Sequence, residues 1–165
     1  MIACVDVDYR DGETVAACVE FRAWGDAQAA AEHVHRSARP PAAYEPGQFF
    51  RRELPYLLEL LALLPSLPQI IVVDGHVWLA GERPGLGAHL HAALDGRAAT
   101  VGVAKRAFHD ANQATPVLRG KSLQPLYVST LGIDRDEAAA GLRAMHGPHR
   151  LPSLLKRVDR LCRDG

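Results

Sequence analysis

Gln69-Ile70-Ile71-Val72-Val73-Asp74-Gly75-His76 contains four consecutive Ile and Val residues followed by an aspartate and a glycine. Such a run predicts a strand buried on both faces, as in the middle of a sheet. A carboxylate at the end of a central strand lies where α/β proteins place their chemistry. Asp-Gly is also a common turn pair, so these residues alone favour a functional Asp74 and a structural Asp74 equally.

The length and charge of the chain limit its class. Its 165 residues suffice for a single domain, residues 1–165, with a sizeable core. Nineteen basic residues balance nineteen acidic ones, so the formal net charge is zero and the basic character of many nucleic-acid-binding domains is missing. Nucleic acid would then be attracted by a local basic patch or by a bound metal ion.

Cysteine usage and hydropathy indicate the compartment. Cys4 and Cys18 lie in apolar strand-like runs, which predicts buried free thiols rather than disulfides. Residues 1–10 show no signal-peptide pattern. The longest apolar stretch, residues 56–64, is interrupted by Glu59 and is too short to span a membrane. The expectation is a protein of the reducing cytoplasm with no membrane partner.

Two β-rich runs at the start of the chain, residues 2–9 and 14–21, flank an Asp-Gly pair and predict a hairpin. Asp6 and Asp8 share one face of the first strand, because side chains alternate along a strand. A buried Asp6 without compensation would be costly. Either this face is solvated, or a cation lies against it.

The remaining segments alternate between helical and strand-like patterns. Residues 26–38 fit a helix by their alanines and a third strand by their position, and local reasoning leaves both open. The other predicted elements are a loop at 39–47, helices at 49–64, 85–94, 134–146 and 151–162, a buried strand at 100–104, and a hairpin of 116–119 with 126–129. This order predicts an α/β fold of the ribonuclease H-like type, a mixed sheet with an antiparallel meander plus parallel strands, flanked by helices.

An ordered set of short motifs runs through nearly the whole chain. The motifs are VDVDY at 5–9, YEPG and RRE within 44–53, VVDGH at 72–76, GLGAHL at 85–90, VGVAK at 101–105, VLRGK at 117–121 and RLP at 150–152. With this order and spacing the sequence resembles the endonuclease V family of deoxyinosine-directed nucleases, as a diverged member that is short at its N-terminus.

The resemblance implies a Mg²⁺-dependent phosphodiesterase, with Mn²⁺ as a substitute, acting on DNA or RNA. The family's metal-binding and catalytic acids fall on Asp6, Glu53 and Asp74, and the metal-binding position of its last helix falls on Asp159. Two Mg²⁺ ions held by oxygen ligands suit an in-line displacement at phosphorus. Lys105, at the end of the neighbouring strand, matches a family lysine near the scissile phosphate.

The resemblance also assigns residues to substrate binding. Tyr44 would stack near a displaced base, and Pro46 and Gly47 belong to the same strand-separating wedge. His76, directly after Asp-Gly, would orient phosphate or a metal-bound water, with a structural histidine as the alternative. Gly85 interrupts a helix start, where bare backbone approaches nucleic acid or simply packs closely.

Departures from the family pattern leave the function open. Glu45 replaces an apolar wedge residue, Ala80 stands at the catalytic histidine position, and Glu82 stands at an arginine position. Val77 replaces a glycine beside the base pocket, where its bulk would obstruct a flipped base. The alternatives are therefore a catalytically inactive homologue that binds nucleic acid or protein, and a Mg²⁺-dependent hydrolase of small phosphoesters.

Other candidates have weaker support. His89 lies in an Ala- and Leu-rich helix, which favours a structural histidine over a ligand. Arg119 and its neighbours through Ser122 suggest either phosphate contacts or an ordinary exposed hairpin tip. Asp8 is given no ligand role, because the family has a small polar residue at that position.

Overall fold

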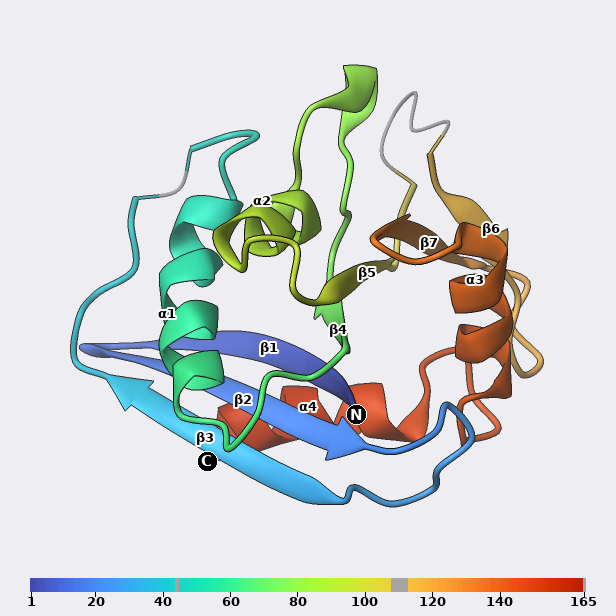
Figure 1. Ribbon diagram of the computed structural model, residues 1–165, viewed down its shortest axis with the longest axis horizontal. Coiled ribbons are helices and arrows are strands. Elements are labelled where there is room, and N and C mark those ends of the chain that lie inside the picture. The colour runs from blue at the N-terminus through green and yellow to red at the C-terminus, as the bar shows by residue number, and fades with distance from the viewer. Residues whose placement is uncertain (44, 108–112, 165) are drawn as a thin grey trace.

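The computed structural model describes residues 1–43, 45–107 and 113–164, and within them it shows a seven-stranded mixed sheet (Figure 1). The strands are β1 (Ile2–Arg10), β2 (Glu13–Phe21), β3 (Ala31–Ser37), β4 (Ile70–Asp74), β5 (Ala99–Ala104), β6 (Thr115–Val117) and β7 (Leu126–Leu131). Their order across the sheet is β3-β2-β1-β4-β5-β7-β6. β1, β4 and β5 are parallel to one another, and all other neighbours are antiparallel. The predicted meander followed by parallel strands is confirmed.

Helices cover both faces of this sheet (Figure 1). They are α1 (Phe50–Ala62), α2 (Leu86–Ala93), α3 (Arg135–Ala144) and α4 (Ser153–Asp164), with a short 3₁₀ turn η1 (Ala80–Glu82). Apolar residues of α1 and α2 pack on one face, and those of α3 and α4 pack on the other. Each predicted helix is therefore present, with ends that differ by a few residues.

The segment left open between helix and strand forms β3, which pairs with β2 along its whole length. Its alanines favour a helix only locally, and the backbone hydrogen bonds offered by β2 outweigh that preference. Side chains on β3 add hydrogen bonds: His33 Nε2 lies 2.9 Å from Glu20 Oε2, and His35 Nε2 lies 3.0 Å from Glu59 Oε2. The strand alternative is the correct one.

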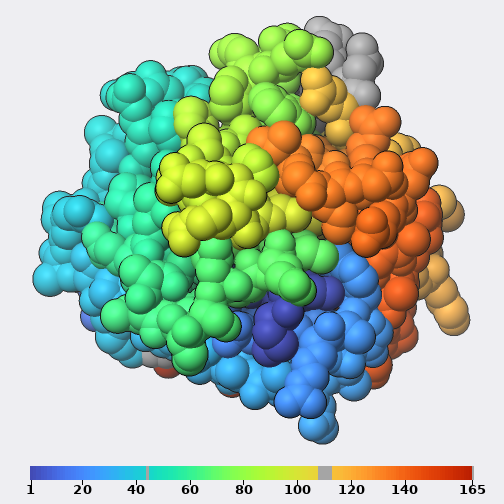
Figure 2. Space-filling model, in the orientation of Figure 1, coloured from blue at the N-terminus to red at the C-terminus, as the bar shows by residue number. Residues whose placement is uncertain are grey.

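β4 is the central strand that its Ile and Val run predicts. Ile71, Val72 and Val73 are fully buried, with Val72 in the core below α4 and the other two in the core below α1. The first half of its neighbour β1, residues 2–5, is also buried, and only a small dark-blue patch from the start of the chain is visible on the face shown in Figure 2. The parallel strands thus form a rigid base whose carboxyl ends share one edge.

The end of α4 is fastened to the end of β1 by Arg10. Its guanidinium donates hydrogen bonds to the backbone carbonyls of Cys162 and Arg163, and it lies 3.3 Å from Asp8 Oδ2. A cation at a helix C-terminus is favourable, because the last carbonyls carry partial negative charge. This attachment holds α4, and with it Asp159 one turn earlier, beside β1. Arg10 also forms the ion pair with Asp8.

Arg119 fastens the loop between α3 and α4 from inside the protein. It is only 6% exposed, and its guanidinium donates to the carbonyls of Met145, Gly147, His149 and Arg150. The suggestion that Arg119 contacts phosphate is therefore wrong. The late hairpin pairs as expected, but its first strand ends at Val117, and the arginine turns inward.

Cys4, Cys18 and Cys162 are all buried and free. Among the described residues, no helix is both long and apolar enough to cross a bilayer.

Gly102 on β5 lets the loop after β4 cross closely over the sheet. A Cβ atom at this position would lie 2.6 Å from the carbonyl oxygen of Gly75 and 2.7 Å from the amide nitrogen of Val77. Gly102→Ala is therefore expected to lower the free energy of unfolding by about 1–3 kcal/mol, since overpacking forces backbone shifts. Chemical denaturation measures this change.

Gly25→Ala is the matched control for that substitution. The nearest atom to a Cβ at Gly25 is the carbonyl oxygen of Ala144, at an ordinary 3.7 Å, so the expected change is within about 0.5 kcal/mol. Wild-type stability in Gly102→Ala would show that residues 75–77 are free to move away, which contradicts the close crossing.

Candidate active site

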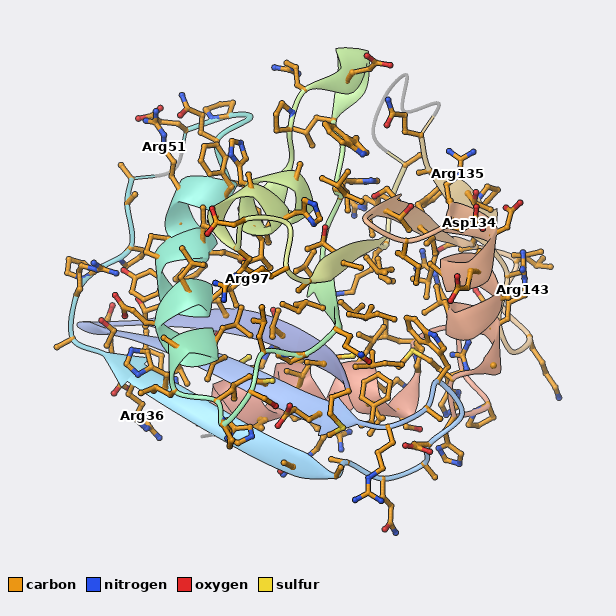
Figure 3. The ribbon with its side chains drawn as sticks, in the orientation of Figure 1. Arg36, Arg51, Arg97, Asp134, Arg135 and Arg143 are labelled. Carbon is orange, nitrogen blue, oxygen red and sulfur yellow. The ribbon has the colours of Figure 1, made fainter. Side chains whose placement is uncertain are left out.

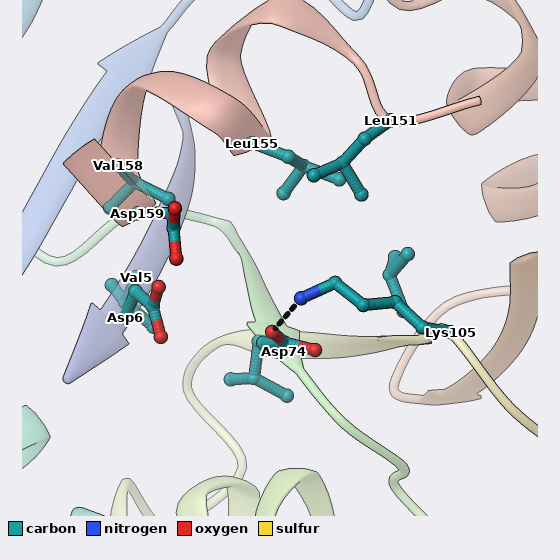
Figure 4. A pocket seen from close by; sticks show the side chains of 10 residues that line it. Val5, Asp6, Asp74, Lys105, Leu151, Leu155, Val158 and Asp159 are labelled. Atoms are coloured by element: carbon teal, nitrogen blue, oxygen red, sulfur yellow. Dashed lines mark hydrogen bonds and ion pairs between the residues drawn. The ribbon is translucent and has the colours of Figure 1, made fainter. Parts of the chain in front are cut away.

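Three acidic side chains and one lysine line a pocket at the carboxyl edge of the parallel strands (Figure 4). Asp6 comes from β1, Asp74 ends β4, Lys105 follows β5, and Asp159 comes from α4. The strand register brings the first three together, since Val5 pairs with Val73 and Asp74 pairs with Val103. The cavity among them has a volume of about 20 Å³, enough for one water molecule or one ion.

Two of these carboxylates form ion pairs with basic side chains. Lys105 Nζ lies 2.8 Å from Asp74 Oδ2, and Arg163 NH2 lies 2.9 Å from Asp159 Oδ1. Asp6 accepts a hydrogen bond of 2.9 Å from the backbone N–H of Val7. Partial burial acts to lower the pKa of Lys105, but its hydrogen bond to Asp74 and the surrounding acids raise that pKa above its ordinary value.

Repulsion among the acids is visible in the pKa of Asp6. The pKa of Asp6 is raised to about 6, first by burial and then by the negative charges of Asp74 and Asp159, while the Val7 N–H and Lys105 oppose the rise. The ionised cluster therefore costs free energy in the protein alone. A cation placed among these carboxylates would offset that cost.

Glu53 approaches the cluster from α1, on the other side of the sheet edge. It is 6% exposed, and burial together with the charges of Asp6 and Asp74 raises its pKa to about 8. Tyr9 donates a hydrogen bond of 3.1 Å to Glu53 Oε1, and the Arg52 guanidinium lies 4.6 Å from the centre of the Tyr9 ring. Glu53 does not line the pocket of the three aspartates, so it reaches the cluster electrostatically rather than by contact.

The oxygen donors of the acidic pocket are of the type that a divalent metal ion needs, but basic side chains are paired with two of them. Within the part of the chain that the structure describes, no group of three or more His, Cys, Asp or Glu side chains is arranged to hold a metal ion. Lys105 and Arg163 instead occupy oxygen atoms of Asp74 and Asp159. The chemistry of the donors nevertheless fits, because Mg²⁺ prefers carboxylate oxygens and its charge would offset the repulsion that raises the pKa of Asp6.

A second, more apolar pocket of about 250 Å³ lies beside the acidic one. Three of the predicted substrate-binding residues, Gly47, His76 and Gly85, line it together. Residues that sequence reasoning did not assign to a site complete the wall: Phe49, Phe50, Gly75, Leu79 and Leu86.

The loop that leads into this pocket is described only in part. Pro46 is exposed beside Gly47 and does not line the pocket, and Tyr44 lies outside the described residues. The adjacent Phe49 side chain is 42% exposed although it is large and apolar. In the sequence, the adjacent Phe49 and Phe50 shortly after Pro46-Gly47 were the pattern that could have indicated this wall.

Val77 does not line the apolar pocket. Its side chain is fully buried and packs against Gly87, where a Cβ atom would lie 2.6 Å from Val77 Cγ2. Its backbone N–H donates to Ser129 Oγ at 2.9 Å. Gly85 lies against the same segment, and its N–H donates to the Val77 carbonyl at 2.8 Å. Only glycine fits at this position, because a side chain would collide with the His76 carbonyl.

The two candidate histidines differ in their surroundings. His76 lines the apolar pocket, and its Nε2 lies 3.0 Å from the carbonyl oxygen of Arg106. Burial lowers the pKa of His76, although the Arg106 carbonyl opposes that effect. His89 stacks on Phe50 with ring centres 3.5 Å apart, which supports its structural interpretation.

These features define the class of protein. A mixed sheet with its meander beside three parallel strands, and with acids gathered at the carboxyl edge, is a ribonuclease H-like fold, as the sequence predicted. A family model described as Endonuclease V matches residues 1–134, a range that contains Asp6, Glu53, Asp74 and Lys105 but not α4. The chain belongs to the endonuclease V family, a family of nucleases.

Individual relatives support this assignment. Endonuclease V of Streptomyces avermitilis is 34% identical over 182 residues, covering 96% of this chain and 77% of the relative. Endonuclease V of Streptomyces coelicolor is 31% identical, with 96% of this chain and 76% of the relative covered. The crystal structure of the Streptomyces avermitilis protein superimposes with a TM-score of 0.76 at 30% identity, over 99% of this chain and 79% of that one.

A more distant structure shares the fold. Endonuclease V of Ciona intestinalis, in complex with a 24mer DNA containing an inosine followed by a ribo-adenosine, superimposes with a TM-score of 0.81 at 17% identity. The superposition covers 99% of this chain and 84% of that chain.

Glu53→Gln is expected to stabilise the metal-free protein at alkaline pH. The folded-state pKa of Glu53, about 8, lies above the ordinary glutamate value of 4.5, so stability is lost as the pH rises through this interval. Glutamine avoids that loss and still accepts from Tyr9, so we expect a gain of roughly 2–4 kcal/mol at pH 9 and almost none at pH 4. Urea denaturation with a chelator present measures it.

The control for this pH dependence is Glu59→Gln on the same helix, where Glu59 pairs with His35 and Arg39 at the surface. It should give no stabilisation that grows with pH. If Glu53→Gln showed the same stability difference from wild type at pH 4 and pH 9, the buried carboxyl would not be strained in the way its surroundings indicate.

Proposed function

We propose that this chain is a Mg²⁺-dependent nuclease, with Mn²⁺ as a substitute, that cleaves nucleic-acid strands at deaminated bases such as inosine and serves DNA repair. The observation that carries the proposal is the shared pocket of Asp6, Asp74, Asp159 and Lys105 at the carboxyl edge of the parallel strands. Membership of the endonuclease V family supports the reaction class. We further propose that residues 1–165 act as one domain in the reducing cytoplasm, where the three free cysteines would remain thiols.

In this proposal Asp6, Glu53 and Asp74 hold metal, with Asp159 assisting from α4. When bound, a divalent ion in such a site supplies Lewis-acid stabilisation and lowers the pKa of an attacking water. Lys105 is half-exposed at the mouth of the pocket, so its ammonium group can leave Asp74 and stabilise charge on the substrate phosphate. Tyr9 keeps Glu53 directed toward the cluster through its hydroxyl group.

The apolar pocket is the proposed place for the displaced base. Its volume of about 250 Å³ and its walls of Phe49, Phe50 and Leu86 suit a flat, weakly polar ring. His76 lines this pocket two residues after Asp74 in the chain, and it would orient the adjacent phosphate. Gly47 and Gly85 allow backbone to approach the base, and Tyr44 and Pro46 would hold the strand open.

A catalytically inactive binding protein is the second candidate. Ala80 at the family histidine position favours it, and so do the ion pairs that occupy Asp74 and Asp159. The two candidates differ in metal binding, since an inactive descendant has no need of a divalent ion among its acids. Calorimetric titration with Mn²⁺ separates them.

The test of the proposed function is incubation of the purified protein with single-stranded DNA and RNA that contain one inosine, in Mg²⁺ or Mn²⁺. Strands with adenosine at the same position are the control. Cleavage of the inosine-containing strands but not of the adenosine controls supports the proposal. A panel of mononucleotides and small phosphoesters is tested in parallel, and turnover of these with no strand cleavage would refute a nuclease.

A further inference from the structure

A basic groove adjoins the acidic pocket at the end of β5. It is lined by Lys105, Arg106 and Ala107 after β5, by Gln124, Pro125 and Tyr127 at the start of β7, and by Arg150 before α4, and its volume is about 390 Å³. Lys105 lines both the acidic pocket and this groove, so the two adjoin at this side chain. None of these residues except Lys105 has a role in the proposed reaction.

The charge of the basic groove is one-sided. Among the residues that the structure describes, the three charged ones that line the groove are all basic, whereas the whole chain has a formal net charge of zero. Among the described residues, the exposed Arg106 side chain has no ion-pair partner. A local concentration of positive charge in a neutral protein attracts a polyanion to that place.

Arg150 is held in position within the groove. Its guanidinium donates to the carbonyl oxygens of Lys105 and Pro125, which fixes the end of β5 against the start of β7. Tyr127 pairs with Ala104 across the two strands and exposes part of its ring to the groove. Fixed cations beside an aromatic ring are the combination that binds single-stranded nucleic acid, with phosphates on the cations and a base on the ring.

We infer that the basic groove binds the strand that flanks the scissile phosphate, so that the substrate is a nucleic-acid chain extending past Lys105 and not a mononucleotide. This inference rests on the proposed function only for the position of the scissile phosphate. Arg106 contacts the backbone of the flanking nucleotides, and Tyr127 stacks on one of their bases. The groove thereby supplies the local attraction that the neutral composition of the chain does not provide.

The test measures binding of fluorescein-labelled, single-stranded deoxyinosine oligonucleotides by anisotropy, with Ca²⁺ in place of Mg²⁺. Arg106→Gln is expected to weaken binding about 3- to 10-fold and to reduce the slope of log affinity against log salt by about 0.7, the value for one phosphate contact on a single strand. Tyr127→Leu should weaken binding at least about five-fold, and Tyr127→Phe should retain it, because only stacking is needed.

Arg143→Gln is the matched control, since it removes the same charge from the exposed surface of α3, where Figure 3 labels Arg143, and this residue does not line the groove. Two series of strands, shortened stepwise on the 5′ or the 3′ side of the inosine, locate the contact. In one series the effect of Arg106→Gln should disappear once the strand no longer reaches the groove.

The outcomes separate the groove from the nuclease. If Arg106→Gln matched Arg143→Gln, or if its effect persisted at every strand length, the groove would not bind the flanking strand. If the effect followed strand length but the wild-type protein cleaved no strand in Mg²⁺ or Mn²⁺, binding of the strand by the groove would be supported and the proposed nuclease activity would be refuted.

Discussion

Asp74→Asn is expected to lower kcat/KM for strand cleavage by at least about 1,000-fold, a loss of roughly 4 kcal/mol of transition-state stabilisation. Asparagine keeps the shape of the side chain but removes the charge that would hold a divalent ion at the centre of the pocket. The folded protein should tolerate the change, because Asp74 is 45% exposed and its ion pair with Lys105 is solvated. Thermal denaturation should therefore show a stability within about 1 kcal/mol of wild type.

Asp8→Asn provides the control for loss of one carboxylate near the site. Asp8 lies two residues after Asp6 on the same strand face but pairs with Arg10 and does not line the acidic pocket. Cleavage should stay within about three-fold of wild type, a barrier change below 1 kcal/mol. Calorimetric binding of Mn²⁺ should be lost in Asp74→Asn and retained in Asp8→Asn.

Two results would contradict the assigned role of Asp74. One is cleavage by Asp74→Asn at the wild-type rate, and the other is an equal loss in Asp8→Asn, which would indicate a general effect of negative charge. If the wild-type protein neither bound Mn²⁺ nor cleaved any strand, the second candidate, an inactive binding protein, would be preferred.

The parts of the fold that were predictable are those that local sequence decides. An unbroken Ile and Val run has no exposed face, so β4 had to be central, and an Asp-Gly pair between β-rich runs had to be the β1–β2 hairpin. β3 was ambiguous because its residues favour helix by themselves and become a strand only through pairing with β2. Such pairing is a long-range property that no window of the sequence contains.

The same distinction applies to the site. The positions of Asp74 and Lys105 follow from their places at the ends of parallel strands, and family motifs pointed to Asp6, Glu53 and Asp159. The direction of a side chain in a loop did not follow in the same way. Val77 turns into the core because its N–H is held by Ser129, 52 residues away in the chain.

Arg119→Met is expected to destabilise the protein by about 3–5 kcal/mol, the largest stability change that we predict. The side chain is 6% exposed, and its guanidinium donates to four backbone carbonyls of the loop between α3 and α4. Methionine fills a similar volume but donates nothing, so these carbonyls lose charged donors that water cannot fully replace. Urea denaturation should show the loss as a lower midpoint with an unchanged slope.

Arg119→Lys tests whether the planar fork or the charge alone is needed. A lysine ammonium group is a single point and cannot reach carbonyls spread along residues 145–150, so most of the destabilisation should remain. Arg143→Met, on the exposed surface of α3, should change stability by less than about 0.5 kcal/mol. A near wild-type midpoint for Arg119→Met would mean that the loop holds its shape without the arginine.

The loop between α3 and α4 also carries Arg150 into the basic groove and leads directly into α4 with Asp159. Any Arg119→Met protein that still folds should therefore bind oligonucleotide more weakly than wild type, although Arg119 itself touches neither site.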